Sequence, residues 1–469
     1  MASAIILLPF YLGDLSTALY GKLAIFLAFS LFVQILVTYS FDSSVYFHYH
    51  EFKKKPERLA DFISSVFIVM LIIASGIGLI LSLTGELLFT YVIQSGNISF
   101  FPYGLASVFT GVFQGIVKVH SSFMQTSERP DIFLWSNSIL FLLIAGLTIL
   151  GLKLYPDSMV GPIGGRLIAS LLVGSWLLIR VFREFGIRLR FGWLKSSFSF
   201  NNYIFIYQIE QWVINYFDRI LIVILLPVSS AATSVGVYDF ALKCLVIVEL
   251  FMNGLHNSFF PRVVSKLVDG NHDSSTSDIN RYYNALIASV MILVCISIFA
   301  FPILIRWFVD KSGYIGAVDY IPFLAIVYLP RVVKLYFASP YGAKKYTRPL
   351  PLLYLVVSVV KIGLMVLLIE RFHIYGVIFS SAIAAITEVI LLRVAIKEKY
   401  TFRFNVYKMI VAPAALFVMV AVLEPLAPAQ YELLKHAGYL AFCILILWIL
   451  YRNEILLLYQ TIISKWLKR

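Results

Sequence analysis

Charged residues are scarce in this sequence: Asp, Glu, Lys and Arg make up only 13% of its 469 residues, whereas 60% are hydrophobic. A soluble protein of this length needs far more polar surface to cover its core. The mean hydropathy of +0.88 and the repeated apolar runs, each of roughly 20 residues, are typical of a polytopic membrane protein. The runs lack the apolar–polar alternation of membrane β-strands, so we expect an all-α fold.

Cysteines and catalytic motifs are also sparse. Cys244, Cys295 and Cys443 stand singly in apolar runs, which excludes a disulfide framework and a zinc-ligand spacing. The sequence has no glycine-rich phosphate loop, no zinc-protease motif and no serine nucleophile elbow. We therefore expect a protein that is not an enzyme and that binds no metal or cofactor. The net charge of +13 is explained by loop residues of a membrane protein, so no nucleic-acid partner is expected.

About fourteen helices are predicted between the charged or turn-rich breaks. They cover residues 1–12, 18–47, 61–84, 101–124, 132–152, 162–182, 203–226, 236–263, 283–308, 320–342, 350–370, 376–396, 408–424 and 436–452. The first is too short to cross about 30 Å of hydrocarbon, so we expect either residues upstream of Met1 or a clipped helix. The step "GVFQG", from Gly111 to Gly115, is compatible with close helix packing.

Lysine and arginine are concentrated in alternate breaks between these helices. The stretch "KKKPER" at 53–58, the arginine-rich segment 180–195 and the C-terminal tail fall on one side of the predicted membrane. The breaks on the opposite side hold few cations. Because positive loops stay inside, we predict that both termini are cytoplasmic.

An internal repeat relates the two halves of the chain. Leu8, Pro9 and Tyr20 recur in the same order and spacing as Leu226, Pro227 and Tyr238. Six helices per half would insert both halves the same way up, which indicates two parallel lobes of a transporter. The predicted organisation is a six-helix lobe at 1–182, a cytoplasmic linker at 183–202, a six-helix lobe at 203–396, and two additional helices with a cytoplasmic tail at 397–469.

Three segments of the chain resemble the oligosaccharide flippases. They are "LLPFYLGDLSTALYG", "FDRILIVILLPVSSAATSVGVYDFALK" and "YGAKKYTRPLPLLYLVVSVVKIGLMVLLIERFHIYGVIFSSAIAA". The resemblance is to the polysaccharide transporter, or O-antigen flippase, family of the MATE-like MOP flippase superfamily. One position departs from the family pattern: its eleventh helix often reads Asn-x-x-x-Asn, where this chain has Lys361 and Met365.

This resemblance implies a function as well as a fold. It implies alternating-access transport of an undecaprenyl-pyrophosphate-linked oligosaccharide across the bacterial inner membrane, for surface polysaccharide biosynthesis. It also implies that a glycan polymerase and glycosyltransferases of the same pathway are partners. Two other functions are considered: a MATE-like drug or cation antiporter and, from a different class, a membrane glycan polymerase. The short outer breaks argue against the polymerase, which needs a sizeable outer domain.

Charged and polar side chains inside the predicted spans are the candidate site residues, because a charge in the bilayer needs a cavity or a partner. Cations can compensate a pyrophosphate, and amides can exchange hydrogen bonds with sugars. The substrate-binding candidates are Arg331, Lys334, Arg219, Lys243, Lys361, Lys118, Gln211 and Asn215. Asp218 and Glu249 are candidates for coupling transport to a proton or sodium gradient.

Several of these residues also have a purely structural interpretation. Asp218, Arg219 and Lys243 could form a buried ion network that stabilises the second lobe. Alternatively, Arg219 binds phosphate and Asp218 the coupling ion, since adjacent helical residues point about 100° apart. Lys118 could extend its ammonium group toward the inner membrane surface instead of binding substrate.

Overall fold

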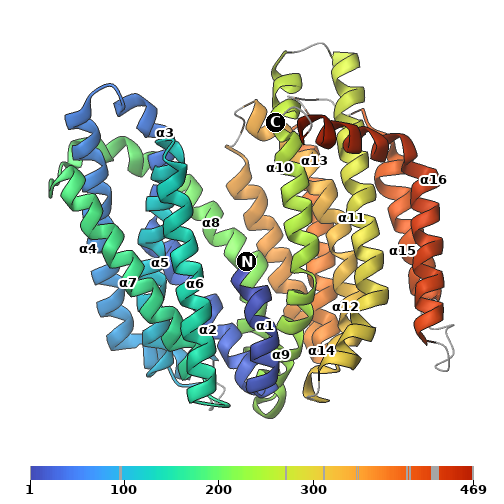
Figure 1. Ribbon diagram of the computed structural model, residues 1–469, viewed down its shortest axis with the longest axis horizontal. Coiled ribbons are helices and arrows are strands. Elements are labelled where there is room, and N and C mark those ends of the chain that lie inside the picture. Colours follow the sequence, from blue (N-terminus) through green and yellow to red (C-terminus); the bar gives the residue numbers. More distant parts are fainter. Residues whose placement is uncertain are drawn as a thin grey trace. The chain divides into compact units, whose positions relative to one another are not determined.

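The computed structural model describes residues 2–93, 98–269, 272–309, 312–344, 346, 348–397, 400, 403–423 and 432–466, and every regular element in them is a helix. The chain forms two compact units, Met1–Asp239 and Phe240–Arg469 (Figure 1). In the described residues, eight helical segments are long and apolar enough to cross a membrane. They are Thr17–Phe52, Pro56–Tyr91, Pro130–Leu154, Val160–Phe185, Ser277–Trp307, Ala317–Ala343, Leu350–Ala395 and Lys435–Leu456. The all-α polytopic architecture is confirmed, while the count of fourteen helices stays a prediction.

The first unit is a bundle in which small residues allow close helix contact. Its elements are α1 (Ala2–Asp14), α2 (Thr17–Thr38), α3 (Phe41–Phe52), α4 (Pro56–Leu88), η1 (Phe89–Ile93), α5 (Tyr103–Thr126), α6 (Pro130–Leu154), α7 (Val160–Phe185), α8 (Phe191–Leu225) and most of α9 (Val228–Cys244). Helices α6 and α7 lie side by side, and α2 packs along α5 (Figure 1). A Cβ at Gly111 would lie 2.5 Å from the Ser30 carbonyl oxygen, which confirms the close packing predicted from "GVFQG".

The second unit is built around α11. Its elements are α10 (Val246–Asp269), α11 (His272–Phe308), η2 (Ser312–Tyr314), α12 (Ala317–Ile326), α13 (Tyr328–Ala343), α14 (Leu350–Ala395), η3 (Tyr407–Val411), α15 (Ala412–Leu423) and α16 (Glu432–Trp466). Helix α11 packs extensively against α16, and α13 packs against both α10 and α14.

Two of the long helical segments break at residues with positive φ angles. Between α2 and α3, Tyr39 and Ser40 have φ angles of 43° and 57°, which are left-handed values that strain non-glycine residues. Within α14, His373 has φ 48° and ψ −128°. A Cβ at Gly376 would lie 2.6 Å from the Leu368 carbonyl oxygen. Eight residues of straight helix rise about 12 Å, so the chain turns back at this point, as the separate predicted spans 350–370 and 376–396 require.

The predicted linker at 183–202 is largely helical. Helix α7 ends at Phe185 and α8 begins at Phe191, so only residues 186–190 connect them. The second part of the predicted linker is helical, and its Phe198 packs edge-on against Phe41 of α3, with ring centroids 5.9 Å apart. Burial of such aromatic side chains stabilises a helix that the local sequence pattern does not reveal. The lobe boundaries drawn from the internal repeat stay a prediction.

Candidate functional site

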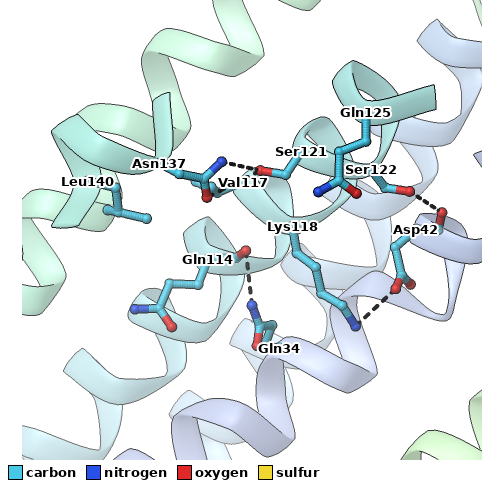
Figure 2. A pocket seen from close by; sticks show the side chains of 10 residues that line it. All are labelled: Gln34, Asp42, Gln114, Val117, Lys118, Ser121, Ser122, Gln125, Asn137 and Leu140. Atoms are coloured by element: carbon cyan, nitrogen blue, oxygen red, sulfur yellow. Dashed lines mark hydrogen bonds and ion pairs between the residues drawn. The ribbon is translucent and has the colours of Figure 1, made fainter. Parts of the chain in front are cut away.

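A polar cavity of about 470 Å³ lies within the first unit (Figure 2). Helices α2, α3, α5 and α6 supply its lining: Gln34, Asp42, Gln114, Val117, Lys118, Ser121, Ser122, Gln125, Asn137 and Leu140. Four of these side chains are amides, two are hydroxyls and two carry opposite charges. Such a lining both donates and accepts hydrogen bonds, which is the chemistry needed to bind sugar hydroxyls.

Helix α5 supplies most of this lining because its polar residues share one face. Gln114, Lys118, Ser121 and Gln125 recur every three or four residues, which places them in one stripe along the helix. The opposite side of the helix is apolar and buried: Ile116, Val119 and Phe123 are at most 2% exposed. The polar stripe is therefore held toward the cavity by packing on the other side.

Lys118 is the only cation among the described lining residues, and it faces Asp42. Lys118 Nζ lies 3.2 Å from Asp42 Oδ2 and 3.4 Å from Gln208 Oε1 (Figure 2 shows the ion pair). The Lys118 side chain is 34% exposed and that of Asp42 is 16% exposed. Within the described residues the second carboxylate oxygen of Asp42, Oδ1, is buried and has no hydrogen-bond partner. The described residues therefore leave one carboxylate oxygen of this ion pair without a hydrogen bond.

Hydrogen bonds fix the amides around this pair. Gln34 Nε2 donates to the Gln114 carbonyl oxygen at 3.1 Å, and Asn137 Nδ2 donates to Ser121 Oγ at 3.0 Å. Ser122 Oγ donates to the backbone carbonyl oxygen of Asp42 at 2.6 Å, which ties the start of α3 to α5. The cavity is thus a preorganised polar surface.

Sequence reasoning found Lys118 but missed Gln34, Asp42 and Asn137 as neighbours. The sequence could have indicated Asp42 as a site residue, because it is the only acidic residue in the predicted span 18–47. Its proximity to Lys118 depends on the left-handed break at Tyr39 and Ser40, immediately before it. No sequence periodicity predicts that break.

Asp218 and Arg219 lie in a second cluster that is almost completely buried. Asp218, Arg219 and Asp239 are 3%, 7% and 2% exposed. Arg219 Nη1 lies 2.8 Å from Asp218 Oδ1, and Arg219 Nη2 lies 2.8 Å from Asp239 Oδ1. Arg219 Nε also donates to Asp239 Oδ1 at 2.8 Å. The guanidinium group of Arg219 is therefore shared between two carboxylates.

Two tyrosines and a backbone carbonyl complete this cluster. Tyr238 Oη donates to Asp218 Oδ2 at 2.7 Å, and Tyr20 Oη donates to Asp239 Oδ2 at 3.1 Å. Arg219 Nη1 also donates to the Asn215 carbonyl oxygen at 3.0 Å. Asp218 and Arg219 thus lie in a buried ion network in which Asp239 is a further acid, and the transport roles predicted for the two residues stay predictions.

The candidates of the second unit are not gathered in one described cavity. Lys334 Nζ lies 2.7 Å from Glu388 Oε1, which joins α13 to α14, and also lies above the Tyr354 ring. The Arg331 guanidinium lies 5.1 Å from the centroid of the Tyr328 ring. Lys361 is buried in α14. The proposed substrate contacts of these cations stay predictions.

The remaining candidates lie on three helices. Gln211 is half-buried on α8, and its carbonyl oxygen accepts a hydrogen bond from Asn215 Nδ2 at 2.7 Å. Lys243 on α9 and Glu249 on α10 are also half-buried. In the residues that the structure describes, no group of three or more His, Cys, Asp or Glu side chains could hold a metal ion.

Comparison with known proteins places this architecture in a family. The family model "Polysaccharide biosynthesis protein" matches residues 3–265, which is more than half of the chain. No curated protein sequence matches the chain. Among solved structures, it is similar to "Lipid II flippase MurJ, inward closed conformation", with 16% identity and a TM-score of 0.70 over 97% of this chain and 98% of that one.

Multidrug transporters share the same fold. A "multidrug resistance MATE family transporter of the MOP superfamily" in an inward-facing conformation has 11% identity and a TM-score of 0.62, over 84% of this chain and 98% of that one. The "MATE multidrug transporter DinF-BH" has 15% identity and a TM-score of 0.54, over 85% of this chain and 87% of that one. The chain therefore belongs to the polysaccharide biosynthesis protein family, and its fold is similar to the folds of these flippase and transporter structures.

Proposed function

We propose that the chain is a flippase that moves a polyprenyl-pyrophosphate-linked oligosaccharide across the bacterial inner membrane by alternating access. The observation that carries this proposal is the polar cavity around Lys118, in a chain of the polysaccharide biosynthesis protein family. The cavity of about 470 Å³ can take one or two sugar residues. Its amides and hydroxyls suit the sugars, and Lys118 suits a phosphate or another anionic group of the head.

The polyprenyl chain of such a substrate needs an apolar surface. The second unit has a groove of about 260 Å³ whose lining is almost wholly apolar, with Ile287, Val333, Ile390, Met409 and Pro413 among its residues. An isoprenoid chain gains free energy by leaving water for such a surface, at roughly 25 cal/mol for each Å² buried. The groove thus offers the kind of surface that the isoprenoid part of such a substrate requires.

The charge of the described cavity disfavours the antiporter alternative. A site for a cationic drug would be expected to present unpaired acids or aromatic faces to the cargo. Asp42 is the only acid that lines this cavity, and it is already paired with Lys118. The proposed partners are the lipid-linked oligosaccharide, the bilayer, and the polymerase and glycosyltransferases that use the same substrate. The proposed orientation, with both termini cytoplasmic, rests on the distribution of Lys and Arg.

Reconstitution in liposomes tests the proposal. The purified chain should flip a fluorescent polyprenyl-pyrophosphate-linked oligosaccharide, and Lys118→Gln should slow flipping by about tenfold or more, because a charge-assisted hydrogen bond contributes roughly 1.5–3 kcal/mol. Lys153→Gln is the matched control, since Lys153 also pairs with an aspartate, Asp14, at 3.3 Å, but does not line the cavity. Equal flipping by wild type and Lys118→Gln would refute the role of the cavity. Transport of a cationic dye, without transport of the lipid-linked sugar, would favour the antiporter.

A further inference from the structure

The last turns of α7, in the first unit, carry a cavity of about 440 Å³. Its lining comes from one helix: Trp176, Ile179, Arg180, Arg183 and Glu184. These residues recur at spacings of three and four, so they share one face of α7. The face is open, because Trp176, Ile179 and Arg183 are all exposed.

The charged side chains on this face differ in whether they have an oppositely charged partner. Glu184 Oε1 lies 2.8 Å from Nη1 of Arg129, the N-cap residue of α6, so its charge is already compensated. In the described part of the chain, no acidic side chain pairs with Arg180 or Arg183. Two guanidinium groups one turn apart therefore form a site for an anion with several oxygens, such as a phosphate.

Two nearby arginines, in contrast, form ion pairs with a carboxylate. Arg188 Nη1 lies 3.5 Å from Asp61 Oδ1, and Arg190 Nε lies 3.2 Å from Asp61 Oδ2. These two residues fix the connection between α7 and α8 onto α4. Among the described residues, Arg180 and Arg183 therefore differ from Arg188 and Arg190, which share a carboxylate partner.

An apolar stripe continues from the arginines toward the middle of α7. Ile168, Leu172, Trp176 and Ile179 follow at intervals of four, four and three residues, and each is about half exposed. At 1.5 Å per residue this stripe extends over about 16 Å. Trp176 lies where the charged part of the face meets the apolar part, the position that indole rings favour at a membrane interface.

We propose that this face of α7 binds an anionic phospholipid. The lipid phosphate would accept hydrogen bonds from Arg180 and Arg183, and one acyl chain would lie along the stripe from Ile179 to Ile168. Charge complementarity selects an anionic head group, and the continuous apolar stripe selects a lipid over a free phosphate. The site is separate from the Lys118 cavity, since the two share no lining residue.

Native mass spectrometry of the full chain, exchanged into phosphatidylglycerol or phosphatidylcholine, tests the proposal. Wild type should retain phosphatidylglycerol preferentially, and Arg180→Gln with Arg183→Gln should weaken that retention by about tenfold or more, since each cation near the membrane surface contributes about 1 kcal/mol. Arg188→Gln with Arg190→Gln is the matched control, because it removes the same charge close by and should leave retention unchanged. Leu172→Asn should also weaken retention, because it interrupts the apolar stripe.

Three outcomes would overturn the proposal. They are equal retention of the two phospholipids by wild type, equal loss in the control variant, and displacement of phosphatidylglycerol by inorganic phosphate alone. Thermal unfolding of each variant shows whether it is folded. If the double variant does not fold, the single variant Arg183→Gln replaces it, because Arg183 is exposed. This variant should show a smaller loss of the preference for phosphatidylglycerol, and an unchanged preference would refute the proposal.

Discussion

Two clusters of opposite charges in the first unit differ in how completely the protein satisfies them. Asp218, Arg219 and Asp239 are buried, and each charged group has a charged or hydroxyl partner at 3.1 Å or less. Lys118 and Asp42 face a polar cavity, and Asp42 Oδ1 has no hydrogen-bond partner among the described residues. The comparison separates buried charges that the protein compensates fully from partly exposed charges that line a cavity.

The difference has a simple physical basis. Removing a charge from water costs several kcal/mol, and only well-placed partners compensate that cost. The Arg219 cluster meets this requirement with two carboxylates and two tyrosine hydroxyls. The Lys118 side chain is 34% exposed, so it keeps part of its hydration and depends less on its protein partner.

The largest effect is expected from Arg219→Gln. The change leaves Asp218 and Asp239 buried without their shared cation, which should destabilise the folded chain by about 3–5 kcal/mol. Unfolding in detergent, followed by tryptophan fluorescence, measures the loss. The combined variant Asp218→Asn, Arg219→Gln and Asp239→Asn removes all three charges and should recover most of the stability. A single variant as stable as wild type would show that the cluster does not stabilise the bundle.

An intermediate effect is expected in the second unit from Lys334→Gln. Glu388 is 6% exposed at its side chain and pairs with Lys334 at 2.7 Å, so this change leaves a buried carboxylate without its cation. We expect a loss of about 1–3 kcal/mol, recovered when Glu388→Gln is added. The same unfolding assay applies, together with the flipping assay. A double variant that is stable but does not flip would support the substrate role predicted for Lys334.

The smallest effect on stability is expected at the cavity. Lys118→Gln and Asp42→Asn should each cost less than about 1 kcal/mol, because partly hydrated ion pairs contribute little. Both variants should nevertheless slow flipping, which is the reverse of the behaviour expected for Arg219. If either variant unfolds as readily as Arg219→Gln, the distinction between the two clusters is wrong.

Much of the fold could be predicted from hydrophobic runs. The predicted spans 132–152 and 162–182 correspond to α6 and α7 within a few residues at each end. The error at the start of α8 has a physical cause, since Phe198 and Phe200 are stabilised by contacts with α3 that lie far away in sequence. The site was harder to predict: Lys118 was recognised as an unusual membrane charge, while its partner Asp42 was not.

The sequence by itself determined the helical membrane class and the positions where charge interrupts apolar runs, because these depend on composition and local periodicity. The family followed from the resemblance of whole segments to known flippases. Tertiary structure decided what each charge does. Asp218 and Arg219 are adjacent in the chain, but their environment depends on Tyr20 and Asp239, from helices α2 and α9. Lys118 meets Asp42 only because the chain breaks at Tyr39 and Ser40 and packs α3 against α5. The free energy of a charge depends on its partners and hydration in space, and local sequence does not specify either one.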